Sequence, residues 1–190
     1  MKRILSIVIL LFVTLLVNGA HYRRTTYSAA SGGCVSDSVV MGYTSTGADT
    51  FNPRDAIYCG RWQANCTGPI DELRYIVTGQ SGAEGVTLGL YADSGGSINA
   101  SAVLRDTGEV YGTGTSDETV VATLDSAYTV TSGTYYWICV ATGSNLYVKK
   151  DVGSENMCRD TDETYVGGTM PTGFTCDAYT YEGSMWGVAQ

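Results

Sequence analysis

The sequence predicts an all-β fold, in the form of an antiparallel β-sandwich stabilised by disulfides. Runs of about five to seven residues rich in β-branched and aromatic side chains recur along the chain, which is the usual length and composition of strands. Turn-forming residues separate these runs, and 24 of the 190 residues are glycine. No segment keeps its apolar residues at the helical period over more than about ten positions. Many short strands divided by turns are typical of a sandwich or a barrel.

The first residues predict a secretory signal peptide. Lys2 and Arg3 precede an apolar run at 4–17, and small residues follow at 18–20, which is the charged, apolar, small order of a cleaved signal. An uncleaved membrane anchor is the alternative, but the apolar run is shorter than the roughly 20 residues that cross a bilayer. We therefore expect a protein that is secreted or held at the cell surface. The expected organisation is a signal peptide at 1–20, a flexible leader at 21–33 and a single β-sandwich domain at 34–190.

Composition and charge argue against a nucleic-acid ligand. The chain has 19 Asp and Glu against 11 Lys and Arg, which gives a net charge of −8. A negative surface repels phosphates instead of collecting them. We therefore expect no nucleic-acid partner. We also expect no stable membrane insertion, because no later apolar run reaches the length of a membrane span.

The expected strands follow one another from residue 35 to the C-terminal end. The run at 86–91 alternates apolar residues with polar or small ones, which places one of its faces on a core. The run at 134–141 is almost continuously apolar, which predicts a central strand covered on both sides and a buried Trp137. Asp-Ser-Gly-Gly at 93–96 predicts a turn, and a helix of one or two turns is expected near 97–104. The expected strands are 35–43, 56–64, 73–77, 86–92, 119–124, 134–141 and a closing strand within 178–189.

The cysteines predict a disulfide framework. They are even in number and all follow the predicted signal peptide, in an oxidising context where disulfides persist. The cysteines are Cys34, Cys59, Cys66, Cys139, Cys158 and Cys176. Proximity in sequence favours Cys59 with Cys66 and Cys158 with Cys176, which leaves Cys34 with Cys139, but the sequence does not select among the possible pairings. A zinc site is the alternative, which the lack of any Cys-x-x-Cys pair and the single histidine, His21, argue against.

The chain from about residue 70 to 190 resembles a jelly-roll module of bacterial exported proteins and of phage tail or fibre proteins. The resemblance lies in Val-Thr-Leu-Gly-Leu-Tyr-Ala-Asp-Ser-Gly-Gly-Ser at 86–97, in Leu104, in Val-Val-Ala-Thr-Leu at 120–124 and in Tyr-Thr-Val-Thr-Ser-Gly-Thr-Tyr-Tyr-Trp-Ile-Cys-Val-Ala at 128–141. Gly-Gly-Thr-Met-Pro-Thr-Gly-Phe at 167–174 is similar to the module's proline-containing loop before its last strand.

This resemblance implies a β-sandwich of jelly-roll type and a role in adhesion, glycan binding or spacing. It does not choose among these roles, because a fold does not fix a function. The chain departs from the module at 97–100, where relatives often carry a Pro-Gly turn, and in its six cysteines. The cysteines suggest a chain that must survive outside the cell without a large core.

Aromatic side chains are the candidate ligand-binding residues. A sugar stacks its apolar face on a flat aromatic ring, and neighbouring polar groups bind its hydroxyls. Trp62 and Trp186 have polar, small or flexible neighbours in the sequence, so either is a candidate for exposure, and Tyr179 and Tyr181 share one strand face by their spacing of two. The alternative for each is packing within the sheet, because aromatic residues suit strands.

One acidic loop is the candidate metal site. Asp160, Asp162 and Glu163 place carboxylates close together in a single loop, and Asp93 or Asp151 could join them from elsewhere. Calcium prefers such oxygen ligands and needs six to eight of them. The alternative is a solvated acidic loop without an ion, because the segment lacks the spacing of a complete calcium-binding loop. No other cofactor is expected.

These observations predict a secreted, non-catalytic module for adhesion or carbohydrate binding, whose partner is a glycan or a cell-surface polymer. A structural subunit of a surface filament, virion or matrix, acting by self-assembly, is the alternative. A carboxylate-based hydrolase is a third possibility, but chance alone places some acidic residues together. We expect no enzymatic activity and no catalytic residues, because the single histidine lies in the predicted leader.

Overall fold

The computed structural model describes residues 33–78, 85–111, 117–143, 145–151, 157–162 and 167–190. The expected signal peptide and all but the last residue of the expected leader lie outside these ranges. Strands and connecting segments make up the described chain, and within it no helix has the length and apolar character that a membrane span requires.

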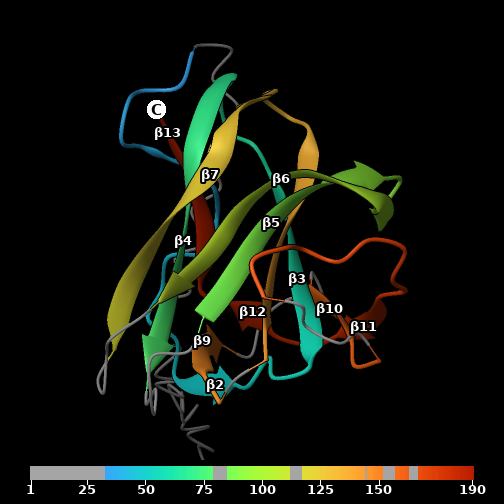
Figure 1. The fold of residues 1–190 in the computed structure, drawn as a ribbon. Helices are drawn as coiled ribbons and strands as arrows, with labels where there is room; N and C mark the ends of the chain where they lie inside the picture. Colours follow the sequence, from blue (N-terminus) through green and yellow to red (C-terminus); the bar gives the residue numbers. More distant parts are fainter. Residues whose placement is uncertain (1–32, 79–84, 112–116, 144, 152–156, 163–166) are drawn as a thin grey trace, which may run out of the picture.

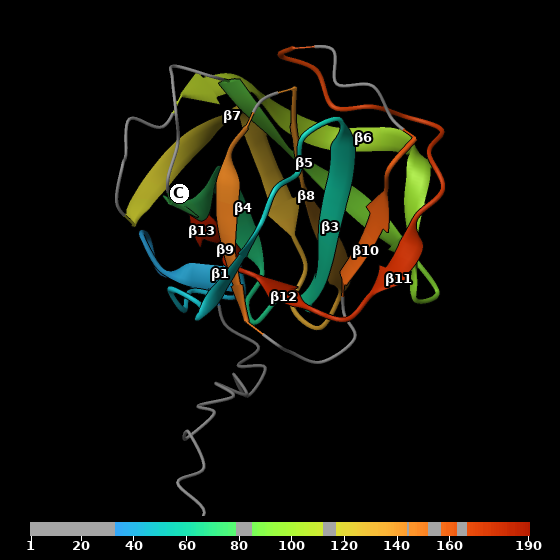
Figure 2. The ribbon, with the colours of Figure 1, turned by 90° about the horizontal axis from the view of Figure 1, so that it is seen from below.

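Within the described residues, thirteen strands form two antiparallel sheets that face each other as a sandwich (Figures 1 and 2), which confirms the predicted all-β sandwich. The jelly-roll topology stays a prediction. The strands are β1 Val39–Gly42, β2 Asp49–Phe51, β3 Ala56–Gln63, β4 Gly68–Thr78, β5 Gly85–Ser94, β6 Ser97–Tyr111, β7 Glu118–Val130, β8 Tyr135–Thr142, β9 Tyr147–Asp151, β10 Met157–Asp160, β11 Asp177–Tyr179, β12 Glu182–Gly183 and β13 Met185–Ala189.

The first sheet, here called the β4 sheet, has the order β1-β13-β4-β9-β12, with β7 beside β4 and β2 beside β9. The second, the β8 sheet, has the order β11-β10-β3-β8-β5-β6. The chain crosses between the sheets at residues 180–181, because β11 belongs to the β8 sheet and β12 pairs with β9. Figure 2 shows this crossing along the near edge of the sandwich.

The main core lies between the sheets and takes residues from strands of both, mostly at alternate positions along each strand. Val86, Leu88 and Leu90 of β5 point into it, as their alternation predicts, and all three are fully buried. The residues between them are buried as well, including Thr87 and Tyr91. Both faces of β5 are therefore covered, because a loop packs on the other face of the β8 sheet.

Strand β8 is covered on both sides, as its apolar run predicts. Every residue from Tyr136 to Thr142 is buried, and Trp137 is 5% exposed. The expected short helix at 97–104 is wrong, because this segment begins β6 and pairs with β5 across the turn at Gly95 and Gly96. Both glycines have positive φ angles, 65° and 101°, which glycine adopts without strain.

Gly60 makes room for the Trp62 ring in the main core. A Cβ atom added to Gly60 would lie 1.9 Å from Cη2 of the indole, which is a rigid ring with no free end to yield. We expect Gly60→Ala to lower the free energy of unfolding by about 2 kcal/mol through overpacking. Urea unfolding followed by circular dichroism measures this loss. Gly187→Ala is the matched control, because Gly187 lies within β13 without a positive φ and its added Cβ would come no closer than 3.5 Å, to the Ile70 side chain, which is an ordinary contact distance.

Three disulfides bind the six cysteines, so the disulfide framework is confirmed and the pairing is corrected. Cys158 pairs with Cys176 as expected. The expected pairs Cys59–Cys66 and Cys34–Cys139 are wrong, because the bonds are Cys34–Cys66 and Cys59–Cys139. Proximity in sequence did not predict these two pairs, because Cys59 and Cys139 lie opposite each other on the neighbouring strands β3 and β8.

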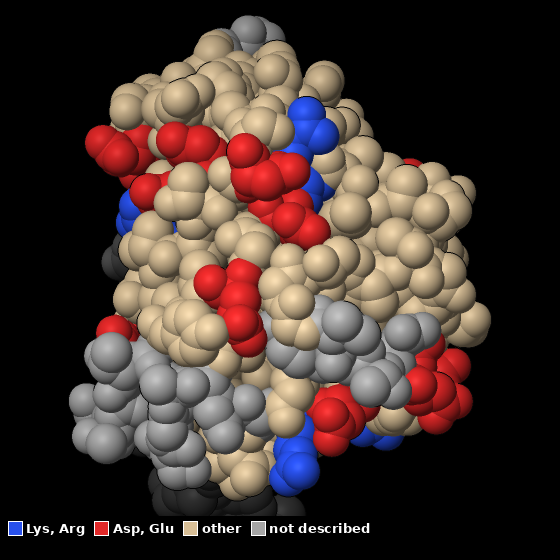
Figure 3. Space-filling model, in the orientation of Figure 1, with Lys and Arg blue, Asp and Glu red and all other residues tan. Residues whose placement is uncertain are grey.

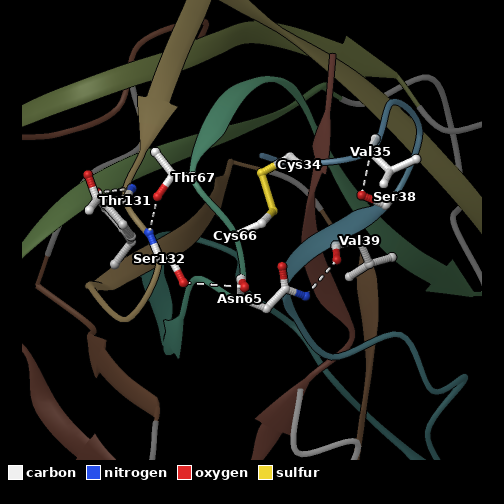
Figure 4. The surroundings of a disulfide bond; sticks show 10 residues. Cys34, Val35, Ser38, Val39, Asn65, Cys66, Thr67, Thr131 and Ser132 are labelled. Atoms are coloured by element: carbon white, nitrogen blue, oxygen red, sulfur yellow. Dashed lines mark hydrogen bonds between the residues drawn. A yellow bond between two sulfur atoms is a disulfide. The ribbon is translucent and has the colours of Figure 1, made fainter. Parts of the chain in front are cut away.

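The Cys34–Cys66 disulfide ties the start of the described chain to the segment before β4 (Figure 4). Polar contacts surround it. The Asn65 side-chain amide donates a hydrogen bond of 3.0 Å to the Val39 carbonyl, and the Ser132 backbone N–H donates one of 2.9 Å to the Thr67 hydroxyl. This bond is therefore a brace at one end of the sandwich, and the other two disulfides belong to the β8 sheet. All three are consistent with an oxidising, extracellular type of environment.

Candidate functional site

The outer face of the β8 sheet, turned away from the β4 sheet, carries a second hydrophobic cluster. Residues 167–176, here called the cap loop, contribute Met170 and Phe174 to this cluster. Three hydrogen bonds or ring contacts fix the loop on the sheet. The Tyr91 hydroxyl donates to the Pro171 carbonyl at 2.6 Å, the Tyr91 and Phe174 rings meet edge to face at 5.5 Å, and the Gly173 N–H donates to the Ala100 carbonyl at 2.7 Å. In Figure 1 the loop lies beside β5 and β6.

A pocket of about 430 Å³ opens beside this cap loop. Its volume falls within the range of about 300–1,000 Å³ that is usual for small-molecule sites. The lining comes from the β5–β6 turn, from β8, β10 and β11 and from the cap loop. Its residues are Gly96, Ser97, Ile98, Trp137, Met157, Cys158, Phe174, Thr175, Cys176 and Ala178.

Hydrogen bonds join the pocket wall to a charged pair. Arg61 on β3 donates from Nε and Nη2 to the two carboxylate oxygens of Asp93 at 2.6 and 3.0 Å. The same carboxylate accepts a 2.9 Å bond from the Trp137 indole N–H and a 3.1 Å bond from the Gly96 backbone N–H. The Arg61 guanidinium also lies over the Tyr135 ring, 3.8 Å from its centroid. Asp93 therefore fixes both the indole and the turn that line the pocket.

The pair is mostly shielded from solvent, and both groups stay charged. The side chains of Arg61 and Asp93 are 23% and 12% exposed. Hydrogen bonds from Arg61 hold the pKa of the Asp93 carboxyl below its usual value, although burial opposes this, and the Gly96 and Trp137 N–H groups act in the same direction as Arg61. The hydrogen bond to Asp93 likewise raises the pKa of Arg61, against the opposing effect of burial.

The two tryptophans that the sequence suggested as ligand-binding residues are buried. Trp62 is 8% exposed and packs in the main core, over the glycine two residues before it. Trp186 is 7% exposed and belongs to a small cluster with Ile76 and Val188. The alternative of packing within the sheet therefore holds for both residues, because each has neighbours that cover its ring.

The Tyr179 and Tyr181 rings lie together, but the expectation that they share one strand face is wrong, because Tyr179 ends β11 and Tyr181 lies in the segment that crosses to the other sheet. Their ring centroids lie 4.8 Å apart, and both side chains are half-buried against the main core. The Lys150 ammonium lies 3.3 Å from the Tyr181 ring centroid and 3.6 Å from the Asp49 carboxylate, and Tyr58 meets Tyr179 edge to face. Burial raises the pKa of Tyr179, which Lys150 partly opposes. These rings cover a buried cation, which leaves their ring faces less open to a sugar.

The carboxylates of Asp160, Asp93 and Asp151, three of the residues considered for calcium, are engaged in other contacts. The Asp160 carboxylate accepts from the Asp162 backbone N–H at 2.8 Å and from the Thr175 N–H at 2.9 Å, and it thereby anchors the cap loop. Asp93 holds Arg61, and Asp151 accepts from the Tyr43 hydroxyl and from the Ala48 N–H. Glu163 lies outside the described residues. Calcium binding stays a prediction.

No pattern in the sequence indicated this pocket. Trp137 was expected to be buried, and it is, but in the outer cluster and not between the sheets. Asp93 was interpreted as a turn residue and a possible calcium ligand, whereas it binds Arg61, 32 positions away. Phe174 sits in a loop without any strand pattern. A salt bridge and a loop contact between distant segments have no periodic signature, so only the folded chain brings them together.

The surface around the fold is acidic, in agreement with the net charge of −8. On the face turned toward the viewer in Figure 3, acidic side chains outnumber lysine and arginine. Comparison with known proteins adds no family: no protein-family model matches the chain, and no curated protein matches it. The resemblance to a jelly-roll module, with the roles that it implies, therefore remains a prediction.

Proposed function

We propose that the protein is a secreted, non-catalytic carbohydrate-binding module whose site is the pocket beside the cap loop. The observation that carries this proposal is the mixed lining of the pocket, in which Trp137 and Phe174 supply aromatic surface and Ser97 and Thr175 supply hydroxyl groups. Saccharides present both apolar C–H faces and hydroxyls, so they match a wall of this kind.

Charge supports a neutral ligand over an anionic one. Arg61, which reaches the pocket wall through Asp93, is already paired with both oxygens of that carboxylate. The remaining surface is net negative, which repels phosphorylated or sulfated ligands. A neutral sugar residue with at least one exposed apolar face is the ligand class that this arrangement favours.

The residues that line the pocket argue against the hydrolase alternative. No Asp or Glu is present among the described residues that line it, whereas glycoside hydrolysis generally needs two carboxylates facing each other across the bond. The structural-subunit alternative stays a prediction, because most of the expected leader at 21–33 lies outside the described residues.

A glycan array tests the proposal with the mature protein and one variant that fills the pocket. Ala178 is exposed and lines the pocket, so Ala178→Trp places a large ring there without removing a core side chain. We expect the wild type to bind a limited set of neutral glycans and the variant to lose at least tenfold in affinity for them. Running the array with calcium and with a chelator tests the calcium prediction on the same sample.

Ala102→Trp is the matched control, because Ala102 is exposed on β6 and does not line the pocket. It adds the same ring to the surface and should leave glycan binding unchanged. Equal binding by the wild type and Ala178→Trp would place the glycan elsewhere and contradict the proposal. Loss of binding in both variants would point to a general effect of an added tryptophan.

A further inference from the structure

Three cysteines and a glycine form one row across the β8 sheet. Cys158 on β10 lies opposite Cys59 on β3, Cys59 lies opposite Cys139 on β8, and Cys139 lies opposite Gly89 on β5. Since all are in register on neighbouring strands, their side chains project to the same face. That face is the outer one, where Cys59, Cys139 and Cys158 belong to the cluster under the cap loop.

Two disulfides therefore lie side by side. The Sγ atoms of Cys59, Cys158 and Cys176 all lie within 4.8 Å of one another, although Cys59 is bonded to Cys139 and Cys158 to Cys176. A disulfide between Cys59 and Cys158 would join directly opposed residues of an antiparallel strand pair, as the existing Cys59–Cys139 bond does. The alternative partner is thus already in place before any bond breaks.

The four cysteines of these two disulfides differ in their exposure to solvent. Cys158 and Cys176 line the pocket, and Cys176 is half-buried while Cys158 is 5% exposed. Cys59 and Cys139 are fully buried. A small thiol that enters the pocket can therefore reach Cys176 first, and it cannot reach the Cys59–Cys139 bond without displacing the sheet or the cap loop.

We propose that the two disulfides form a thiol-exchange relay that is opened from the pocket by a low-molecular-weight thiol. The thiolate of the external thiol attacks the Sγ of Cys176, which forms a mixed disulfide there and releases Cys158 as a thiolate. Cys158 then attacks the Sγ of Cys59, which forms a Cys59–Cys158 disulfide and releases Cys139 as a thiolate that takes up a proton. Each step exchanges one S–S bond for another, so no separate oxidant or reductant is needed.

This relay is independent of the saccharide proposal, because it needs an open pocket and not a sugar ligand. A glycan array that finds no ligand leaves the relay untouched, and a failed exchange leaves the glycan site untouched. The Cys34–Cys66 disulfide ties the start of the described chain to the segment before β4 and takes no part in the relay.

Reduced glutathione is the probe for the experiment. The folded protein is incubated with it, the exchange is stopped with acid, free thiols are alkylated, and the disulfide-linked peptides are mapped by mass spectrometry. We expect glutathione on Cys176, a Cys59–Cys158 linked peptide and alkylated Cys139, with the last two in equal amounts. The variant with Cys34→Ser and Cys66→Ser should give the same products, because the relay does not use that bond.

Three results would overturn the relay. One is a free thiol that stays on Cys158 with no Cys59–Cys158 peptide. Another is mixed pairing of Cys34 or Cys66 with the other cysteines in the wild type, since that indicates exchange in the unfolded chain. The third is an unchanged rate of Cys176 modification in Ala178→Trp, which fills the pocket, relative to the Ala102→Trp control. We expect the rate in Ala178→Trp to fall at least fivefold.

Discussion

Replacing Cys59 and Cys139 together by alanine is expected to lower the free energy of unfolding by about 5 kcal/mol. The bond joins residues 80 positions apart, and a loop of this length contributes about 4 kcal/mol by restricting the unfolded chain. Both cysteines are fully buried in the cluster under the cap loop, so the loss of their sulfur atoms adds about 1 kcal/mol through the small cavities left behind. Urea unfolding of the wild type and the double variant measures the difference.

The double variant with Cys158→Ala and Cys176→Ala is the comparison for this prediction. This bond spans only 18 positions, and chain restriction then contributes about 3 kcal/mol. The bond inside the sheet should therefore matter more than the bond that holds the cap loop. An equal or larger loss in the second variant would mean that the cap loop, and not the β3–β8 pair, limits the stability of the fold.

Asp93→Asn is expected to lower the free energy of unfolding by about 3 kcal/mol at neutral pH. The change leaves the Arg61 charge without its carboxylate partner in a largely shielded position, where breaking one side of an ion pair is costly. It also weakens the acceptor for the Trp137 indole and the Gly96 N–H. The loss is measured by chemical unfolding of the wild type and the variant at several pH values.

The pH dependence has a definite direction. The pKa of Asp93 is lower in the folded protein than in the unfolded chain, so its stabilising effect is complete above the unfolded value of about 3.9 and disappears as the pH falls through the folded value. The stability difference between wild type and Asp93→Asn should therefore be constant near neutral pH and shrink below about pH 4. A difference that persists unchanged into strong acid would show that the carboxylate charge is not its source.

Asp125→Asn is the matched control, because Asp125 also faces an arginine. Its side chain is 57% exposed, and its carboxylate lies 3.8 Å from Arg105. An exposed pair at this distance contributes little to stability. The control should therefore change the unfolding midpoint much less than Asp93→Asn does, and at every pH.

Local patterns predicted the strands that carry them. The apolar run of β8 and the alternation of β5 indicated both their structure and their burial, because period and composition act within a single strand. The segments Tyr147–Asp151 and Met157–Asp160 were not expected as strands. Both are short and mix charged with apolar residues, so their partners in the sheets, and not their own composition, decide their conformation.

The candidate site was not predicted from the sequence, for a related reason. Ser97–Tyr111 was expected to begin as a helix, since its first residues include small side chains without a clear strand period, but pairing with β5 holds it as a strand. The pocket lies between this strand pair, β10 and the cap loop. It depends on contacts between residues far apart in the chain, such as Asp93 with Arg61, and these leave no periodic signal in the sequence.

The most direct test of the central claim follows the three tryptophan indoles while a glycan identified on the array is added. Each indole N–H gives its own signal in a proton–nitrogen correlation spectrum, and a Trp137→Phe variant assigns the signal of Trp137. If the pocket beside the cap loop is the binding site, the Trp137 signal shifts in a saturable way while those of Trp62 and Trp186 stay in place. A saturable shift at Trp62 or Trp186, with none at Trp137, would contradict the assignment of the site.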